Sequence, residues 1–180
     1  MQTQGKQAVP EGIMMKTIRA THEFPPFYDR ESQILILGSF PSVKSRESKF
    51  YYGHPQNRFW PLLAQLRGTE RPVSVDEKKR FLAQQHIALW DVLESCTISG
   101  SSDSSIRDPV PTDLGLIFRA ADIRCIFTNG KTAHRLFYRF QRQISPCDVC
   151  NLPSTSPANA AWSLEKLHKE WLVINDYLTK

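Results

Sequence analysis

The sequence is poor in several features that define large protein classes. Four cysteines in 180 residues are too few for a disulfide scaffold. No window comes close to the roughly 18 uninterrupted apolar residues of a transmembrane helix. The segment from Met1 to Pro10 lacks the apolar stretch of a signal peptide. We therefore expect a cytoplasmic protein with no membrane partner.

Acidic residues are also in the minority. The chain has 23 Lys and Arg against 18 Asp and Glu, a formal net charge of +5. This excludes an acidic solvating protein and mildly favours a polyanionic partner, although many basic enzymes bind no nucleic acid. The length and the 41% hydrophobic content fit one domain with a substantial core. We expect the polar residues 1–15 to form a disordered tail and residues 16–180 to form that domain.

Short apolar runs alternate with segments of helical periodicity. The run 34–37, closed by Gly38, is typical of a strand buried on both faces of a sheet. Further strands are predicted at 87–92, 123–127 and 149–152, and helices near Asn57, after Ser74, and at 114–121, 131–142 and 163–178. Residues 97–112 are rich in Ser, Asp and Pro and are predicted to form a loop. The alternation predicts an α/β fold, a three-layer α/β/α sandwich with a central, mainly parallel sheet.

Two loops are candidates for a functional site. One is Gly38-Ser39-Phe40-Pro41-Ser42 and the other is residues 152–157. Both directly follow a predicted strand and are dense in small, polar and Pro residues. In such folds the site lies beyond the carboxyl ends of the strands. We therefore expect these loops to form it.

Both loops resemble motifs of the uracil-DNA glycosylase superfamily. The first loop, followed by Tyr51-Tyr52-Gly53-His54-Pro55-Gln56-Asn57-Arg58-Phe59-Trp60, is most similar to the hypoxanthine (deoxyinosine) DNA glycosylase branch. The second loop, Leu152-Pro153-Ser154-Thr155-Ser156, is similar to the second motif of the superfamily. The resemblance implies an enzyme that rotates a damaged base out of DNA and hydrolyses its bond to deoxyribose.

One position departs from the pattern of the superfamily. Many members carry Asp or Asn where this chain has Phe40, and Phe can neither orient water nor accept a proton. The resemblance moves the catalytic role to Asn57, whose amide can hold a water but is a poor base. Spacing alone favours Asn57 as the N-cap of the following helix, and one residue can serve both purposes. The resemblance also places Gly38 and Ser39 in the base pocket.

Further pocket residues follow from the same resemblance. Phe40 and Tyr52 are expected to stack on the flipped base, unless they are ordinary core aromatics. Ser42 stands where strict uracil enzymes have a bulky Tyr, which leaves room for a purine. Asp91 falls where relatives read the base, or else it is a helix cap or a salt-bridge partner. His54 either stabilises the departing base or bonds the backbone.

DNA contacts are expected from the second loop. Ser154, Thr155 and Ser156 can bind phosphates through hydroxyl and backbone N–H groups, although such loops are also common as plain turns. Many relatives place a bulky or basic wedge just after this motif. Here Ala158 and Asn159 stand in that region, so we expect them near DNA but predict no strong wedge.

Basic residues recur on one predicted helix. Lys131, Arg135, Arg139 and Arg142 share a face, and Lys131 begins the helix, where backbone N–H groups favour anions. This face is either a track for phosphates or an ordinary solvated surface.

No cofactor is expected. Cys147 and Cys150 have metal-like spacing, but Cys96 and Cys125 do not complete a metal-binding pattern. The chain also has no Gly-rich phosphate-binding loop and no His-rich motif. We predict that the protein binds no metal.

The leading hypothesis is a monofunctional glycosylase that acts as a monomer on DNA containing deaminated bases. Hypoxanthine is the first substrate, with uracil or xanthine as further ones. A second hypothesis, motivated by Phe40, is a DNA-binding protein of the same fold with weak or no catalysis. A third is an α/β hydrolase or nucleotide-binding enzyme unrelated to DNA.

Overall fold

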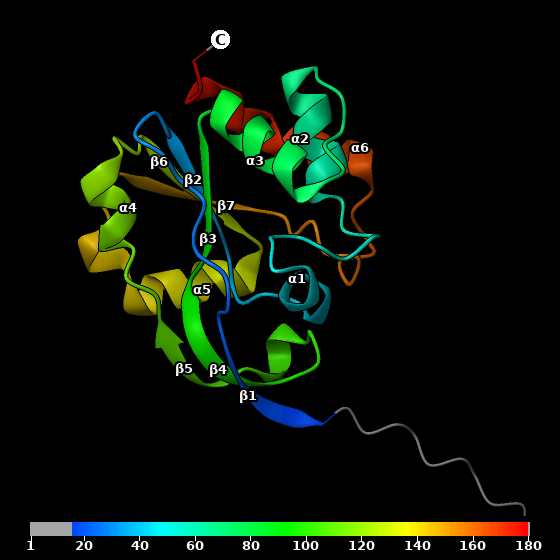
Figure 1. Cartoon of the computed structure of the whole chain (residues 1–180), viewed down its shortest axis with the longest axis vertical. Helices are drawn as coiled ribbons and strands as arrows, with labels where there is room; N and C mark the ends of the chain where they lie inside the picture. The colour runs from blue at the N-terminus through cyan, green and yellow to red at the C-terminus, as the bar shows by residue number, and fades with distance from the viewer. Residues whose placement is uncertain (1–15, 180) are drawn as a thin grey trace, which may run out of the picture.

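Four parallel strands form the central sheet, in the order β3-β2-β6-β7 (Figure 1). The strands are β2 (Ile34–Gly38), β3 (Ile87–Asp91), β6 (Cys125–Asn129) and β7 (Asp148–Leu152). All four were predicted from their apolar runs. This computed structural model describes residues 16–179, so the expected tail at residues 1–15 lies outside the described residues.

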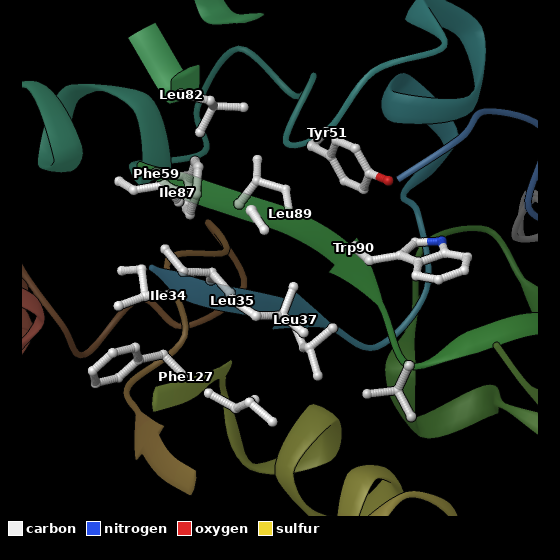
Figure 2. Close-up of a cluster of buried hydrophobic side chains, with 14 of the residues drawn as sticks. Ile34, Leu35, Leu37, Tyr51, Phe59, Leu82, Ile87, Leu89, Trp90 and Phe127 are labelled. Carbon is white, nitrogen blue, oxygen red and sulfur yellow. The ribbon is translucent and has the colours of Figure 1, made fainter. Parts of the chain in front are cut away.

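β2 lies between two neighbouring strands because its residues suit burial on both faces. All five of its residues are buried, and Ile34 pairs with Ile87 of β3 and with Cys125 of β6. Figure 2 shows the side chains packed around β2 and β3, with Tyr51 and Trp90 near the end of β3 that leads to the loops. Burial on both faces gives the sheet a rigid edge from which these loops emerge.

Helices cover both faces of the sheet (Figure 1). One face carries α2 (Phe59–Arg67), α3 (Val75–Gln84) and α6 (Leu164–Trp171), and the other carries α4 (Gly115–Ala120) and α5 (Lys131–Phe140). The three-layer α/β/α arrangement is therefore confirmed.

The ends of the helices show where local signals were sufficient. The predicted capping box starts α3, because Ser74 Oγ accepts from the Glu77 N–H and the Glu77 carboxylate accepts from the Ser74 N–H. The predicted ends of the last two long helices were too late. The chain tightens into the 3-10 helices η2 (Arg142–Ile144) and η3 (Leu172–Asp176), so Arg142 lies outside α5.

The prediction of a loop at 97–112 was wrong. A second, antiparallel sheet of order β1-β4-β5 consists of Thr17–Thr21, Leu93–Ser99 and Arg107–Pro111, with the 3-10 helix η1 (Asp103–Ser105) between β4 and β5. β5 is an edge strand that is mostly exposed, so its two prolines are tolerated and it has no apolar run. The short helix α1 (Val43–Ser48) follows the first loop.

The parallel arrangement brings four strand ends to one edge. β2, β3, β6 and β7 end at Gly38, Asp91, Asn129 and Leu152. Both candidate loops therefore leave the sheet at this edge.

Candidate active site

A cavity of about 300 Å³ opens at the carboxyl ends of the strands. Its lining includes most of the residues singled out from the sequence: Gly38, Ser39, Phe40, Ser42, Tyr52, His54, Asn57, Asp91, Ser154, Thr155, Ser156 and Ala158. Asn159, Lys131 and Arg135 are not among the lining residues. The fold thus joins the two motifs in one concave site of the kind that holds a small ligand.

Ser42 connects the first loop to α1. Its hydroxyl accepts from the Ser45 N–H at 3.2 Å and caps the helix. The Ser45 hydroxyl in turn accepts from the Gly53 N–H at 3.0 Å. These bonds fix the start of the segment that carries His54 and Asn57.

Only one of the two polar atoms of the Asn57 side chain forms a hydrogen bond to another described residue. Its Oδ1 accepts from the Phe59 N–H at 3.0 Å at the start of α2, but the N-cap of α2 is Arg58, so Asn57 is not the N-cap that its spacing favoured. No hydrogen bond joins its Nδ2 to another residue within 16–179. The side chain therefore presents an amide donor to the cavity, and a catalytic role stays a prediction.

His54 makes the backbone bond that was the alternative to a role at the base. Its Nδ1 accepts from the Gln56 N–H at 3.1 Å while the residue lines the cavity. Stabilisation of a departing base stays a prediction.

Arg58 is a structural centre of the site that sequence reasoning missed. Its guanidinium donates to the carbonyls of Thr155, Ser156, Asn159 and Trp162, and its backbone N–H donates to Thr155 O. One side chain from the first motif thereby bonds four carbonyls, two in the second loop and two in the segment that follows it. Its position beside Asn57 in the motif was the available signal.

Asn129, at the end of β6, supports the second loop with two hydrogen bonds to Thr155. Its Nδ2 donates to Thr155 Oγ1 at 2.9 Å, and its Oδ1 accepts from the Thr155 N–H at 3.0 Å. Thr155 lines the cavity but is fully buried, and its N–H and hydroxyl oxygen support the loop. Binding of a phosphate by Thr155 stays a prediction.

Ser154 and Ser156 keep free donors. Ser154 Oγ accepts from the Ser156 N–H, and Ser156 Oγ accepts from the Ala158 N–H, each at 3.2 Å. A hydroxyl that accepts a backbone bond still has its O–H to donate. Asn159 closes the loop, because its Nδ2 donates to Ser154 O at 3.0 Å.

Asp91, at the end of β3, lines the cavity and bonds to His22, a partner that the sequence did not predict. His22, which follows β1, places Nε2 2.9 Å from Asp91 Oδ2, and both side chains are buried. Asp91 therefore has a hydrogen-bonding partner in His22, which is a salt bridge only when the imidazole is protonated, and base reading stays a prediction. A Cβ at position 38 would overlap Asp91 Oδ1, so only glycine allows this approach.

Both predicted aromatics line the cavity, and both also belong to the packed interior. Phe40 is 7% exposed, and Tyr52 stacks on Phe59 with centroids 3.8 Å apart. Tyr52 adopts a left-handed backbone with φ 53°, a costly conformation held by its surroundings. Burial first, and then the charge of Asp91, raise the pKa of the Tyr51 and Tyr52 phenols. Stacking on a base stays a prediction.

Asp103 of η1 also lines the cavity, although the sequence offered no signal for it. The Ser39 hydroxyl donates to Asp103 Oδ1 at 2.7 Å. The residue retains solvent access, but crowding by protein raises the pKa of its carboxyl, and the nearby Asp91 raises it further. The cavity is thus lined by a second carboxylate, which η1 contributes from the connection between β4 and β5.

The basic residues of α5 lie beside the cavity. Gly130, at the start of α5, has φ 101°, and a Cβ there would lie 3.0 Å from Ser154 Cβ. Lys131 and Arg135 are exposed on α5, and the charge of Arg135 acts on Asp103. Arg139 and Arg142 lie over the rings of Phe140 and Tyr138.

Two further expectations concern metals and membranes. Over residues 16–179, no group of three or more His, Cys, Asp or Glu side chains is arranged to hold a metal ion. Cys125 and Cys150 are free thiols with Sγ atoms 3.9 Å apart. In the same part of the chain, no helix is long and apolar enough to cross a bilayer.

Known proteins resemble this chain over most of its length. It matches the Uracil DNA glycosylase superfamily over residues 25–178. It is 35% identical over 150 residues to the Hypoxanthine DNA glycosylase of Methanosarcina acetivorans, covering 82% of this chain and 93% of that protein. A protein of the same name from Methanosarcina barkeri is 34% identical over 110 residues, 60% of this chain and 70% of that protein.

A solved structure shares the fold. It is a solution NMR structure from Methanosarcina acetivorans, described as a candidate uracil DNA glycosylase. The TM-score is 0.71 at 30% identity, over 84% of this chain and 96% of that chain.

The hydrogen bonds of Arg58 predict a large effect of its removal. In Arg58→Met, four carbonyls lose their donor, and we expect the free energy of unfolding to fall by about 2 kcal/mol. Urea denaturation measures this change. Arg119→Met is the matched control, because Arg119 makes only an exposed ion pair with Asp113 at 3.6 Å, and it should lose less than about 1 kcal/mol. Equal losses in the two variants would contradict the role given to Arg58.

Proposed function

The chain belongs to the uracil DNA glycosylase superfamily, and from this premise we propose that it is a monofunctional DNA glycosylase that removes deaminated bases, hypoxanthine first. The observation that carries the proposal is the single cavity formed by both motif loops at the carboxyl ends of the strands. The similarity to two proteins named Hypoxanthine DNA glycosylase supports the choice of base. Uracil and xanthine are further substrates of the same kind.

The chemistry fits a site that stabilises charge and positions water. As the glycosidic bond breaks, positive charge grows on the sugar and negative charge on the departing base. The Asn57 amide donor is proposed to hold the attacking water. No lysine occurs among the lining residues of the described chain, so water is the proposed nucleophile, in place of a lysine amine that would form a Schiff base.

We assign base selection to four side chains that line the cavity, those of Asp91, Ser42, Phe40 and Tyr52. The Asp91 carboxylate, held by His22, can accept from the N1–H of hypoxanthine or the N3–H of uracil. Adenine has an unprotonated N1 at the same place, so an acceptor would face an acceptor. The small Ser42 side chain leaves room for a purine, and Phe40 and Tyr52 are proposed to stack on it.

We assign DNA binding to the second loop and to the exposed cations of α5 beside it. The free hydroxyl donors of Ser154 and Ser156 are proposed to bind phosphates next to the lesion, with Ala158 and Asn159 close by. Lys131 and Arg135 add positive charge beside this loop. Action as a monomer in the cytoplasm is part of the same proposal.

Phe40 favours a second candidate, a member of this fold that binds lesions without cutting them. It places an apolar ring where many relatives carry a polar catalytic side chain. Binding without excision in the assay below would favour this candidate.

Excision of deoxyinosine is the direct test of the proposed function. Single-turnover reactions with EDTA use duplexes containing one deoxyinosine, one deoxyuridine or only normal bases. We expect alkali-sensitive sites at deoxyinosine, fewer at deoxyuridine and none in the normal duplex. Undiminished cleavage in EDTA is expected, because the protein is predicted to bind no metal. Intact deoxyinosine strands at enzyme excess would contradict the proposal.

Asn57→Ala tests the catalytic assignment. Loss of a positioned water should lower the single-turnover rate about 100-fold. Asn57→Ser separates this effect from loss of the bond to the Phe59 N–H, because a Ser hydroxyl can still accept that bond but Ser has no amide donor. We expect it to keep most of the stability lost in Asn57→Ala and to stay slow. Asn151→Ala on exposed β7 is the matched control. A wild-type rate in Asn57→Ala or Asn57→Ser would refute the assignment.

The α5 cations predict a salt-dependent contribution to binding. Lys131→Ala and Arg135→Ala should each weaken binding to any DNA sequence and reduce the slope of log K against log salt by about 1. Fluorescence anisotropy at several salt concentrations measures both quantities. Arg80→Ala on α3, across the sheet from α5, is the control and should leave the slope unchanged. Unchanged slopes in the α5 variants would identify this face as an ordinary solvated surface.

A further inference from the structure

The cavity offers few groups that can take a proton from water. Phe40 has no polar atom, and Asn57 Oδ1 is already bonded to the Phe59 N–H. Among the described lining residues, Asp91 and Asp103 are the only carboxylates. Asp91 is buried, with Oδ2 2.9 Å from His22 Nε2 and Oδ1 close to Gly38. Asp103 is the carboxylate that remains accessible to a water.

The position of Asp103 is fixed by bonds to the first loop. The Ser39 hydroxyl holds Asp103 Oδ1 at 2.7 Å, and no described residue forms a hydrogen bond to Oδ2. The segment leading to η1 is attached to α1, because the Val43 N–H donates to Ser101 Oγ at 2.9 Å and Arg46 donates to Gly100 O at 3.1 Å. These bonds hold one oxygen of the carboxylate and leave the other for a ligand.

The charges around Asp103 suit a base. Crowding by protein and the charge of Asp91 raise its pKa, while the Ser39 bond and the charge of Arg135 lower it. The other titratable groups that interact with Asp103 are Tyr52 and Cys96, whose own pKa values are raised by burial. A carboxylate that binds protons more readily than usual is a better base near neutral pH.

We propose that Asp103 is the carboxylate that holds and deprotonates the nucleophilic water, in the place that Phe40 leaves without a polar group. The role rests on the proposed glycosylase function. Asn57 Nδ2 is the second group that holds this water. In this proposal Asp103 is a catalytic residue contributed by η1, the connection between β4 and β5, outside both motifs.

The proposed step conserves atoms and charge. The water oxygen forms a bond to C1′ of the sugar, and the bond between C1′ and the base breaks. The base leaves with that electron pair and takes a proton from solvent. Asp103 Oδ2 receives the proton lost by water and later releases it to solvent. The negative carboxylate also stabilises the positive charge on the sugar before the water has attacked.

Three variants at one position test the proposal in the full chain. Asp103→Asn keeps the shape and the acceptor for Ser39 but is a poor base, so its single-turnover rate on deoxyinosine should fall about 100-fold. The wild-type rate should decrease as pH falls through the Asp103 pKa, and this dependence should disappear in Asp103→Asn. Asp103→Ala should regain activity severalfold in added formate, and Asp103→Glu should regain part of it.

Asp108→Asn is the matched control. Asp108 lies on β5, shortly after η1 in the chain, is exposed and is not among the lining residues. The excision rate of Asp108→Asn should therefore equal that of wild type. Urea denaturation of each variant reports whether the fold is kept.

The outcomes separate the possible failures. A wild-type rate in Asp103→Asn would overturn the proposal. A slow Asp103→Asn that keeps the wild-type pH profile, with no formate effect in Asp103→Ala, would make Asp103 a structural anchor and overturn it as well. If wild type itself excises no base, the proposed function fails, whereas an active wild type confines the failure to Asp103.

Discussion

The site depends on the hydrogen bonds of Arg58 to the second loop. The two motif loops follow β2 and β7, which are not neighbours, because β6 lies between them. Arg58 extends across this separation to the carbonyls of Thr155, Ser156, Asn159 and Trp162, and Asn129 at the end of β6 supports the same loop. A guanidinium suits this role because its donors are fixed in one plane and stay charged. These bonds join the two loops that line the cavity.

A second constraint is the close approach of two strands beneath the cavity. Gly38 lets the Asp91 carboxylate lie against the end of β2. The chain then continues beside the first loop, because the Val92 and Leu93 N–H groups donate to Gly38 O and Ser39 O. In this way one extended segment leaves the parallel sheet as β3 and enters the antiparallel sheet as β4. The same path brings His22 to Asp91 and Asp103 to Ser39.

Positive and negative side chains lie in different places around the cavity, and each suits a different part of the proposed function. Lys131 and Arg135 lie outside the cavity, where a phosphate backbone would pass, and they contribute to the net charge of +5. Among the lining residues, Asp91 is close enough to Asp103 for its charge to raise the pKa of the Asp103 carboxyl. A cationic rim attracts DNA, whereas carboxylates in the interior favour the positive sugar that forms when the base leaves. In the proposed function, a basic protein would thus use acidic residues where the base leaves.

The sequence by itself determined the sandwich, the capping box at Ser74 and the two loops, because apolar runs and motifs are local patterns. It could not reveal β1 and β5, which are largely exposed and have no apolar run. Nor could it show that Thr155 is buried while Ser154 and Ser156 keep free donors. Only the tertiary structure decided the partners of Arg58, Asp91 and Asp103, because these contacts join segments far apart in the chain. Their formation depends on how the strands are ordered and where the chain changes sheets.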